Sequence, residues 1–262
     1  MDVDAYLARI GASRPAAPSV AALRELQERH LATVPFENLS VHLPEPIVLT
    51  EDALADKIVR RRRGGFCYEL NGAFASLLRE LGFAVTLLSA RVWTGERFGP
   101  PFDHLTLRVD LDEPWLADVG FGRFARFPLR IAGRGPQPDP EGEFLLAEAP
   151  HGDLDVRHDG EPVYRLESRP RDLADFAPTC WFQATSPESH FTQGLMCTLP
   201  RTDGRITLAG DKLIETTDDK RVERVLVGEE ILDVYATHFG IHLNEAPTPG
   251  SFPPPGLRPF PN

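Results

Sequence analysis

Residues 63–82 read RGGFCYELNGAFASLLRELG. After Phe66 its apolar residues recur every three or four positions, which predicts an amphipathic helix that ends before Gly82. Cys67 lies in the first turn, where the helix dipole and unpaired backbone N–H groups favour the nucleophilic thiolate. The two glycines before it leave room for a substrate to approach. Without partner residues, however, a small buried core residue is the commoner role of a free cysteine.

The segment before this helix is predicted to be helical as well. Apolar periodicity and capping residues place helices over residues 3–10, 18–34 and 50–63. We therefore expect residues 1–83 to form a helical unit that carries Cys67.

From residue 84 onward the pattern changes, because apolar and polar residues alternate as they do in strands. The glycine- and proline-rich stretch at residues 133–142 predicts a loop. Many short strands at this spacing are typical of an antiparallel barrel or sandwich, which we expect over residues 84–192. The expected strands cover residues 85–93, 104–110, 115–119, 144–147, 154–158 and 163–167.

The last part of the chain, residues 193–262, mixes strands with a helix and is expected to be a small α/β unit. Strands are predicted near residues 206–208 and 222–227, and a helix over residues 229–239. The tail from residue 247 is rich in proline, which favours an extended or disordered chain. The predicted fold class is therefore α+β.

Composition limits the function classes. The chain of 262 residues carries a net charge of −11, which disfavours nucleic-acid binding. The acidic N-terminus does not resemble a secretory signal, and no stretch is apolar for long enough to cross a bilayer. Cys67, Cys180 and Cys197 are odd in number and widely spaced, which favours free thiols over disulfides or metal sites. We therefore expect a cytoplasmic protein that binds neither nucleic acid, membrane nor metal.

A cysteine nucleophile needs a base and a group that orients the base. His104 opens the expected strand HLTLRVD, on the face opposite to Leu105 and Leu107. A short turn leads back through WLADV and brings Asp118 within a few residues of His104. An aspartate in that place fixes the tautomer of the ring and stabilises its protonated form. Each residue alone also has an ordinary structural explanation, so the indication rests on the set of Cys67, His104 and Asp118.

Six segments of the chain resemble the arylamine N-acetyltransferase family. They come in the order that the family has and span almost the whole sequence, which makes them specific as a set. The segments are PFENLS (35–40), RGGFCYELN (63–71), FDHLTL (102–107), DVGFG (118–122), SPESHF (186–191) and HFGIHL (238–243).

The resemblance implies both a fold and a reaction. The fold is a helical bundle, a central antiparallel β-barrel and a C-terminal α/β lid, with a core like that of cysteine proteases. The reaction moves an acetyl group from acetyl-CoA to an arylamine, arylhydrazine or hydrazine by a ping-pong mechanism. It proceeds through a thioester on Cys67, with His104 and Asp118 completing a triad. No tightly bound cofactor is implied, because acetyl-CoA is a cosubstrate.

The resemblance also implies which residues contact the substrates. Phe36 is expected beside the thiol, and Arg63 is expected near the site in a charged pair with Glu37. The other expected contacts are the segment that approaches coenzyme A, Gly120, Phe121 and Gly122, and the cleft residues Trp93 and Phe191.

Three other functions remain open at this point. An amide synthase related to this family uses the same triad to close a macrolactam from a carrier-bound acyl chain. A transglutaminase-like or papain-like hydrolase also orders a cysteine, a histidine and an aspartate or asparagine. A catalytically silent protein with this fold would bind a small molecule or coenzyme A without reacting.

Overall fold

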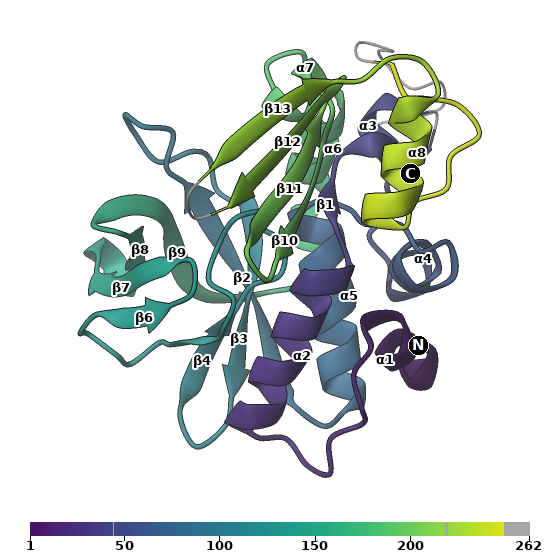
Figure 1. The fold of residues 1–262 in the computed structure, drawn as a ribbon. Helices are drawn as coiled ribbons and strands as arrows, with labels where there is room; N and C mark the ends of the chain where they lie inside the picture. Colours follow the sequence, from purple (N-terminus) through teal and green to yellow (C-terminus); the bar gives the residue numbers. More distant parts are fainter. Residues whose placement is uncertain (44, 218–219, 249–262) are drawn as a thin grey trace, which may run out of the picture.

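The computed structural model describes residues 1–43, 45–217 and 220–248, and within them the helices predicted for the first eighty residues are confirmed (Figure 1). Asp2, Ser19 and Thr50 cap three of these helices with side-chain oxygens that accept backbone N–H groups. The third predicted helix ends earlier than expected, because Arg62 adopts a left-handed φ of 52°. The elements are α1 (Val3–Ile10), α2 (Val20–Thr33), α3 (Leu39–His42), α4 (Glu51–Ala55), the π-helical turn η1 (Asp56–Arg60) and α5 (Cys67–Glu80).

Helix α5 is buried on nearly all sides rather than on one face. Every residue from Cys67 to Leu78 is buried. The helix contacts α1 and α4 on one side and strands β2 (Ala84–Val92) and β3 (His104–Asp110) on the other. The apolar stripe predicted from the sequence is present, but its opposite face is covered as well (Figure 1).

The central sheet is antiparallel and nearly closes into a barrel, as expected. Its strands follow the order β5-β4-β3-β2-β9-β8-β7-β6. The end strands β5 and β6 meet through the side chain of Gln137, which accepts the N–H of Arg130 at 2.7 Å and donates to its carbonyl at 3.1 Å. The remaining strands are β4 (Pro114–Ala117), β5 (Leu129–Arg130), β6 (Gln137–Asp139), β7 (Gly142–Glu148), β8 (Leu154–His158) and β9 (Glu161–Arg171).

The prediction that residues 133–142 form only a loop was wrong. Strand β6 lies inside this stretch and pairs with β7. Pro138 has no N–H to donate, but β6 is an edge strand, where one row of backbone groups needs no partner.

A helical segment follows β9, within residues 84–192, which were expected to form the barrel and for which no helix was predicted. It consists of the 3-10 turn η3 (Leu173–Phe176), α6 (Ala177–Thr185) and α7 (His190–Gln193). Asn38 fastens α7 to the N-terminal part, because its amide donates to the carbonyls of Phe191 and Gly194 at 2.8 and 2.7 Å. No helix in the described part of the chain is long and apolar enough to span a membrane.

The second sheet combines both ends of the described chain. Its order is β1-β10-β11-β12-β13, so a short strand from the helical part pairs with the C-terminal strands. Helix α8 packs beside it through Val234, Tyr235 and Phe239. The proline-rich tail lies outside the described residues from position 249 on. The elements are β1 (Phe36–Glu37), β10 (Met196–Arg201), β11 (Gly204–Ala209), β12 (Lys212–Thr217), β13 (Arg221–Val225) and α8 (Glu230–Phe239).

Candidate active site

Cys67 is the first residue of α5, where backbone N–H groups have no partner within the helix. The preceding residue, Phe66, is extended, and Glu69 reaches back to accept its N–H at 3.4 Å. This contact closes the first turn of α5. The side chain is 4% exposed, so the thiol reaches solvent only through the cleft described below.

Close backbone packing brings Phe36 to the thiol. A Cβ at Gly64 would overlap the carbonyl of Pro35, so only glycine fits there. Gly65 forms a bridge with Phe36, and its carbonyl accepts the N–H of Glu37 at 2.9 Å. The two glycines thus allow β1 to run directly beside the cysteine turn.

The sheet supplies the other two predicted residues of the set. His104 is the first residue of β3, and Asp118 directly follows β4. His104 Nε2 lies 2.6 Å from Asp118 Oδ2, and the two side chains are 3% and 0% exposed. Cys67 lines the same cleft as His104 and contributes to the raised pKa of its ring, and the other ring nitrogen, Nδ1, is not used by Asp118. The structure therefore brings Cys67, His104 and Asp118 together, in the order thiol, imidazole, carboxylate.

The protonation of this pair follows from its surroundings. Burial alone would lower the pKa of His104, but Asp118 and then Cys67 outweigh burial and raise that pKa to about 10. Burial would likewise raise the pKa of Asp118, whereas the charge of His104 and several hydrogen bonds hold it below its usual value. At neutral pH the pair is therefore an imidazolium beside a carboxylate.

Asn71 holds the carboxylate, a role that was not predicted from the sequence. Its Nδ2 donates to Asp118 Oδ1 at 2.9 Å and to the carbonyl of Leu105 at 2.7 Å, while its Oδ1 accepts the N–H of Val119 at 2.9 Å. Asn71 stands four residues after Cys67, on the same face of α5. The spacing of four residues places Asn71 one helical turn after the thiol, and it is the sequence signal from which the contact of Asn71 with Asp118 was predictable.

Tyr164 is a second residue whose role at the site was not predicted from the sequence. Its hydroxyl donates to Asp118 Oδ2 at 3.3 Å from β9, and its ring lies 5.3 Å from that of His104. Phe121 covers His104 from another side, edge-on at 5.1 Å. These contacts hold the imidazole ring in one orientation.

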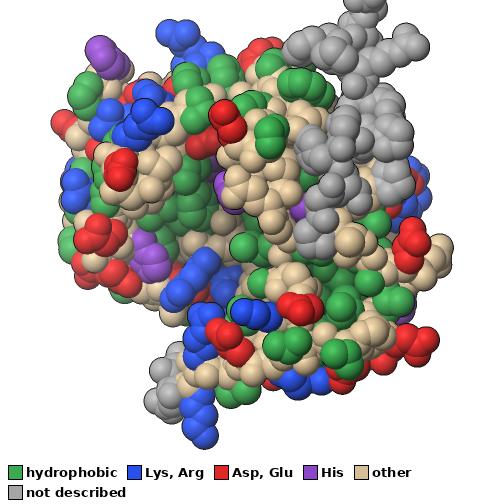
Figure 2. Space-filling model, turned by 90° about the horizontal axis from the view of Figure 1, so that it is seen from above, with side chains coloured by type: hydrophobic (Ala, Val, Ile, Leu, Met, Phe, Trp, Pro, Cys, Tyr) green, Lys and Arg blue, Asp and Glu red, His purple; other side chains and the backbone are tan. Residues whose placement is uncertain are grey.

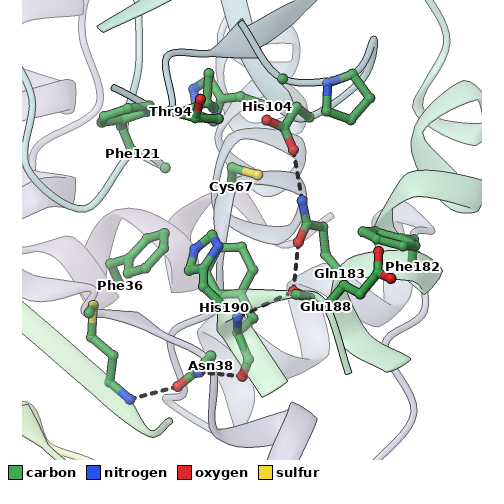
Figure 3. A pocket seen from close by; sticks show the side chains of 18 of the residues that line it. Phe36, Asn38, Cys67, Thr94, His104, Phe121, Phe182, Gln183, Glu188 and His190 are labelled. Carbon is green, nitrogen blue, oxygen red and sulfur yellow. Dashed lines mark hydrogen bonds between the residues drawn. The ribbon is translucent and has the colours of Figure 1, made fainter. Parts of the chain in front are cut away.

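The thiol opens into a cleft of about 570 Å³. In the space-filling view from above, hydrophobic side chains line the hollow in this face of the molecule (Figure 2). The close-up shows Cys67 pointing into open space between side chains from the helical part, the central sheet and α6 (Figure 3). The predicted residues that line the cleft are Phe36, Cys67, Trp93, His104, Gly120, Phe121 and Phe191.

Comparison with known proteins identifies the family. A family model described as N-acetyltransferase matches residues 19–248. The arylamine N-acetyltransferase / N-hydroxyarylamine O-acetyltransferase of Salmonella typhimurium is 36% identical over 250 residues, with 92% of this chain and 89% of that protein covered. The arylamine N-acetyltransferase of Mycolicibacterium smegmatis is 34% identical over 259 residues, with 94% of each chain covered. The chain belongs to the arylamine N-acetyltransferase family.

Solved structures of arylamine N-acetyltransferases have the same fold. The Mycobacterium marinum arylamine N-acetyltransferase in complex with CoA superimposes with a TM-score of 0.83 at 31% identity, covering 92% of this chain and 93% of that one. The α+β fold and the acetyltransferase class of this enzyme therefore rest on both sequence and structure.

Two substrate contacts expected from the arylamine N-acetyltransferase family lie outside the cleft. Arg63 is 5% exposed and forms ion pairs with Glu37 at 3.0 Å and Glu45 at 2.9 Å, so its charge is matched inside the protein. Gly122 lies behind the ring of Phe36, which a Cβ would approach to 3.4 Å.

The glycines of the Gly120–Phe121–Gly122 segment are required by close packing in this member of the family. At Gly120 a Cβ would come within 2.8 Å of the Cα of Cys67, and Gly122 has a φ of 88°. Only glycine therefore lets this segment pass beside the thiol and turn away. Within the described residues no group of three or more His, Cys, Asp or Glu side chains is placed to hold a metal ion.

Proposed function

We propose that this enzyme transfers an acetyl group from acetyl-CoA to an arylamine, arylhydrazine or hydrazine through a thioester on Cys67. The observation that carries the proposal is the His104–Asp118 contact of 2.6 Å, directly behind a thiol at a helix N-terminus in an aromatic cleft. The relatives named above are N-acetyltransferases, which does not favour the amide synthase alternative.

In the first half-reaction the Cys67 thiolate attacks the thioester carbonyl of acetyl-CoA. The new C–S bond gives a tetrahedral oxyanion, which a preorganised donor must stabilise. The backbone N–H of Cys67 points from the helix start and is our candidate for one such donor. The bond to coenzyme A then breaks, and the leaving thiolate takes the proton that His104 carries.

In the second half-reaction the acceptor amine attacks the acetyl-cysteine. His104, now neutral, takes a proton from the attacking nitrogen, and the Cys67 thiolate leaves. An aromatic amine suits this step because its low basicity leaves it unprotonated at neutral pH. The rings of Phe36, Phe121 and Phe191 in the cleft walls offer surfaces on which an aromatic acceptor stacks.

The parts of the fold have separate tasks under this proposal. The helical part supplies the nucleophile on α5, and the central sheet supplies the base and its carboxylate on β3 and after β4. We further propose that the enzyme works in the cytoplasm, where its three free, buried cysteines stay reduced.

Steady-state kinetics with acetyl-CoA and 4-methylaniline test the proposal. Double-reciprocal plots at several acceptor concentrations are expected to be parallel, because the first product leaves before the acceptor reacts. Cys67→Ala is expected to abolish transfer, while Cys180→Ala, another buried free thiol, keeps it. Substantial transfer by Cys67→Ala, or intersecting plots, would rule out the covalent mechanism.

A further inference from the structure

The side chains that line the cleft include negative charges without lysine or arginine to match them. In the part of the chain that the structure describes, the lining includes the carboxylates Asp103 and Glu188 but no lysine or arginine. Both carboxylates lie outside the Cys67–His104–Asp118 set and have no role in the acetyl transfer proposed above.

Asp103 is built into the inner wall of the cleft. Its backbone carbonyl accepts the hydroxyl of Tyr68 at 3.1 Å, from the turn that also carries the thiol. Its Oδ1 accepts the side-chain N–H of Gln183 at 2.7 Å, and the hydroxyl of Ser189 donates to the other end of that amide at 2.7 Å. The Ser189 hydroxyl therefore turns the NH₂ end of Gln183 toward Asp103 and holds the carboxylate in place. Figure 3 shows Gln183 with a hydrogen bond at each end of its amide.

No lysine or arginine of the described residues pairs with these carboxylates; burial raises the pKa of Asp103, and the charge of His104 offsets only part of that effect. Neither Asp103 nor Glu188 takes part in an ion pair there, and the nearby Arg91 donates to the carbonyl of Gly99, a residue of the cleft lining. The positive charge of His104 is matched by Asp118. Burial lowers the pKa of His190, and Asp103 offsets only part of that effect, which disfavours a positive charge on His190.

We propose that this cleft selects neutral or cationic amines and hydrazines as acceptors and rejects acceptors that carry a carboxylate, with Asp103 and Glu188 as the specificity residues. An anionic acceptor loses its hydration in the cleft and meets two charges of its own sign. An acceptor with a further N–H or ammonium group instead donates to them. The donor is compatible with this field, because the thioester end of acetyl-CoA that must reach Cys67 is uncharged.

This inference rests on the proposed function, so the test separates the two. Acetyl-enzyme is formed with acetyl-CoA, freed of excess donor and detected by intact mass; its discharge is then timed with 4-aminobenzamide and with 4-aminobenzoate. The two acceptors have nearly the same shape and differ in charge. In the absence of any effect of the protein, the amine of 4-aminobenzoate is the more reactive nucleophile, because a carboxylate withdraws less electron density from the ring than an amide does.

We expect the neutral acceptor to discharge the enzyme about tenfold faster or more, which is the scale of a like-charge contact in a partly buried site. Asp103→Asn and Glu188→Gln are each expected to reduce this ratio. Asp112→Asn, which removes an exposed charge from the distant β3–β4 turn, is expected to leave it unchanged. The ratio of the two discharge rates is compared between variants. A substitution that disturbs the catalytic groups slows both reactions alike, so that effect cancels in the ratio.

Equal discharge by both acceptors, or faster discharge by 4-aminobenzoate, would overturn the inference while leaving the transferase function intact. A ratio unchanged in both cleft variants would equally overturn the role of Asp103 and Glu188. Failure to form any acetyl-enzyme would overturn the proposed function itself, and the specificity inference with it.

Discussion

Single side chains hold the candidate site in its reactive geometry, and the amide of Asn71 is central among them. It ties α5 to both Asp118 and the N–H of Val119, so it joins the helix that carries the thiol to the turn that carries the carboxylate. Because every donor and acceptor of this amide is used in a buried place, its orientation is fixed. We therefore regard Asn71 as a positioning residue.

We predict that Asn71→Ala lowers kcat/KM for acetyl transfer by about 100-fold, because Asp118 and His104 lose their alignment with the thiol. The free energy of unfolding is expected to fall by about 1–3 kcal/mol, since the buried N–H of Val119 is left without an acceptor. Steady-state kinetics and urea denaturation measure the two effects. Ser76→Ala is the matched control, because that hydroxyl lies on the same helix and bonds only to Gly72 of its own turn. Wild-type transfer by Asn71→Ala would contradict the positioning role.

The raised pKa of His104 has a consequence for stability. Since this pKa is about 10 in the folded protein, against an ordinary value of 6.5, the folded state holds the proton more tightly than the unfolded chain does. The resulting stabilisation is fully present below about pH 6.5 and is lost as the pH rises through about 10.

We predict that the protein loses its stability advantage over His104→Gln, by a few kcal/mol, between about pH 6 and about pH 10.5. Guanidinium denaturation of both proteins across this range gives the difference directly. A difference that stays constant with pH would show that His104 is not held as an imidazolium in the folded state.

The sequence predicts some of these residues better than others, for physical reasons. Cys67, His104 and Asp118 stand at element boundaries whose periodicity is clear, and the structure brings them together. Tyr164 joins them from β9, 46 positions from Asp118, and only the register of the closed sheet reveals that contact. Arg63 belongs to a recognisable segment, but its direction depends on two carboxylates that no local pattern identifies.

At the scale of secondary-structure elements, the packing of α1, α2 and α5 leaves polar groups unpaired. The ring of His30 lies 5.9 Å from that of Tyr6 and 5.2 Å from that of Phe74. Neither ring nitrogen of His30 has a hydrogen-bond partner among the described residues. Burial, with a smaller contribution from Arg9, lowers the pKa of His30 to about 3.

We predict that these helices make the protein acid-sensitive. Because the pKa of His30 is depressed in the folded state, its contribution to stability is present above about pH 6.5 and is lost as the pH falls toward 3. His30→Leu is expected to unfold at a higher temperature than the wild type at about pH 5. Leucine has no ionisable group, whereas the imidazole of His30 must lose its proton when the chain folds. His151→Leu, at an exposed turn, is the control. Equal acid sensitivity of His30→Leu and the wild type would contradict this account.

Elements with strong periodicity are predicted well here, and elements held by single side chains are not. The helices at Val3–Ile10 and Val20–Thr33 carry both an apolar stripe and a capping residue, so their bounds are readable. Strand β6 exists because Gln137 and Asp139 bond to backbone groups outside their own hairpin. Such contacts leave no periodic signal in a stretch rich in glycine and proline.

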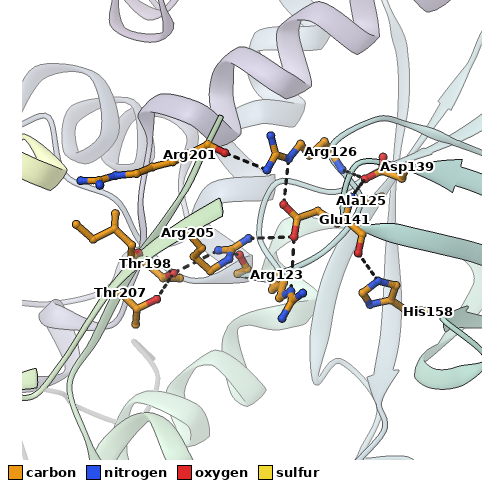
Figure 4. A network of polar contacts seen from close by, with 12 residues as sticks. Arg123, Ala125, Arg126, Asp139, Glu141, His158, Thr198, Arg201, Arg205 and Thr207 are labelled. Atoms are coloured by element: carbon orange, nitrogen blue, oxygen red, sulfur yellow. Dashed lines mark hydrogen bonds and ion pairs between the residues drawn. The ribbon is translucent and has the colours of Figure 1, made fainter. Parts of the chain in front are cut away.

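At the scale of the whole molecule, Arg205 joins the second sheet to the central one. It stands on β11, donates to the carbonyl of Gly122 at 2.7 Å and approaches Glu141 to 3.9 Å (Figure 4). Arg126 adds a second link, because its side chain donates both to Glu141 at 3.0 Å and to the carbonyl of Arg201 at 3.0 Å. The second sheet thus holds the Gly120–Phe121–Gly122 segment beside the thiol from outside.

We predict that Arg205→Gln lowers the free energy of unfolding by about 2–3 kcal/mol, because a largely buried charge network loses a partner. It is also expected to lower kcat/KM for acetyl-CoA, since the segment that passes Cys67 is released. Thermal unfolding and transfer kinetics measure both effects. Arg221→Gln, an exposed arginine on β13 of the same sheet, is expected to change neither. If both variants behave alike, the sheet does not position this segment.

The second sheet also marks the limit of sequence-based domain assignment. Strand β1 pairs with β10 across about 160 positions, Phe36 lying opposite Thr198. The predicted boundaries at residues 83 and 192 follow changes in periodicity, whereas this two-residue strand is too short to have a period. Long-range pairing of that kind appears only once the chain has folded.

Cys67 is proposed to carry the acetyl group between donor and acceptor. Intact-mass measurement of the purified protein within seconds of adding acetyl-CoA, with no acceptor present, tests it most directly. We expect a gain of one acetyl group that is absent in Cys67→Ala and is discharged by adding an arylamine. A folded protein whose Cys67 reacts with iodoacetamide but gains no acetyl group from acetyl-CoA would contradict the account.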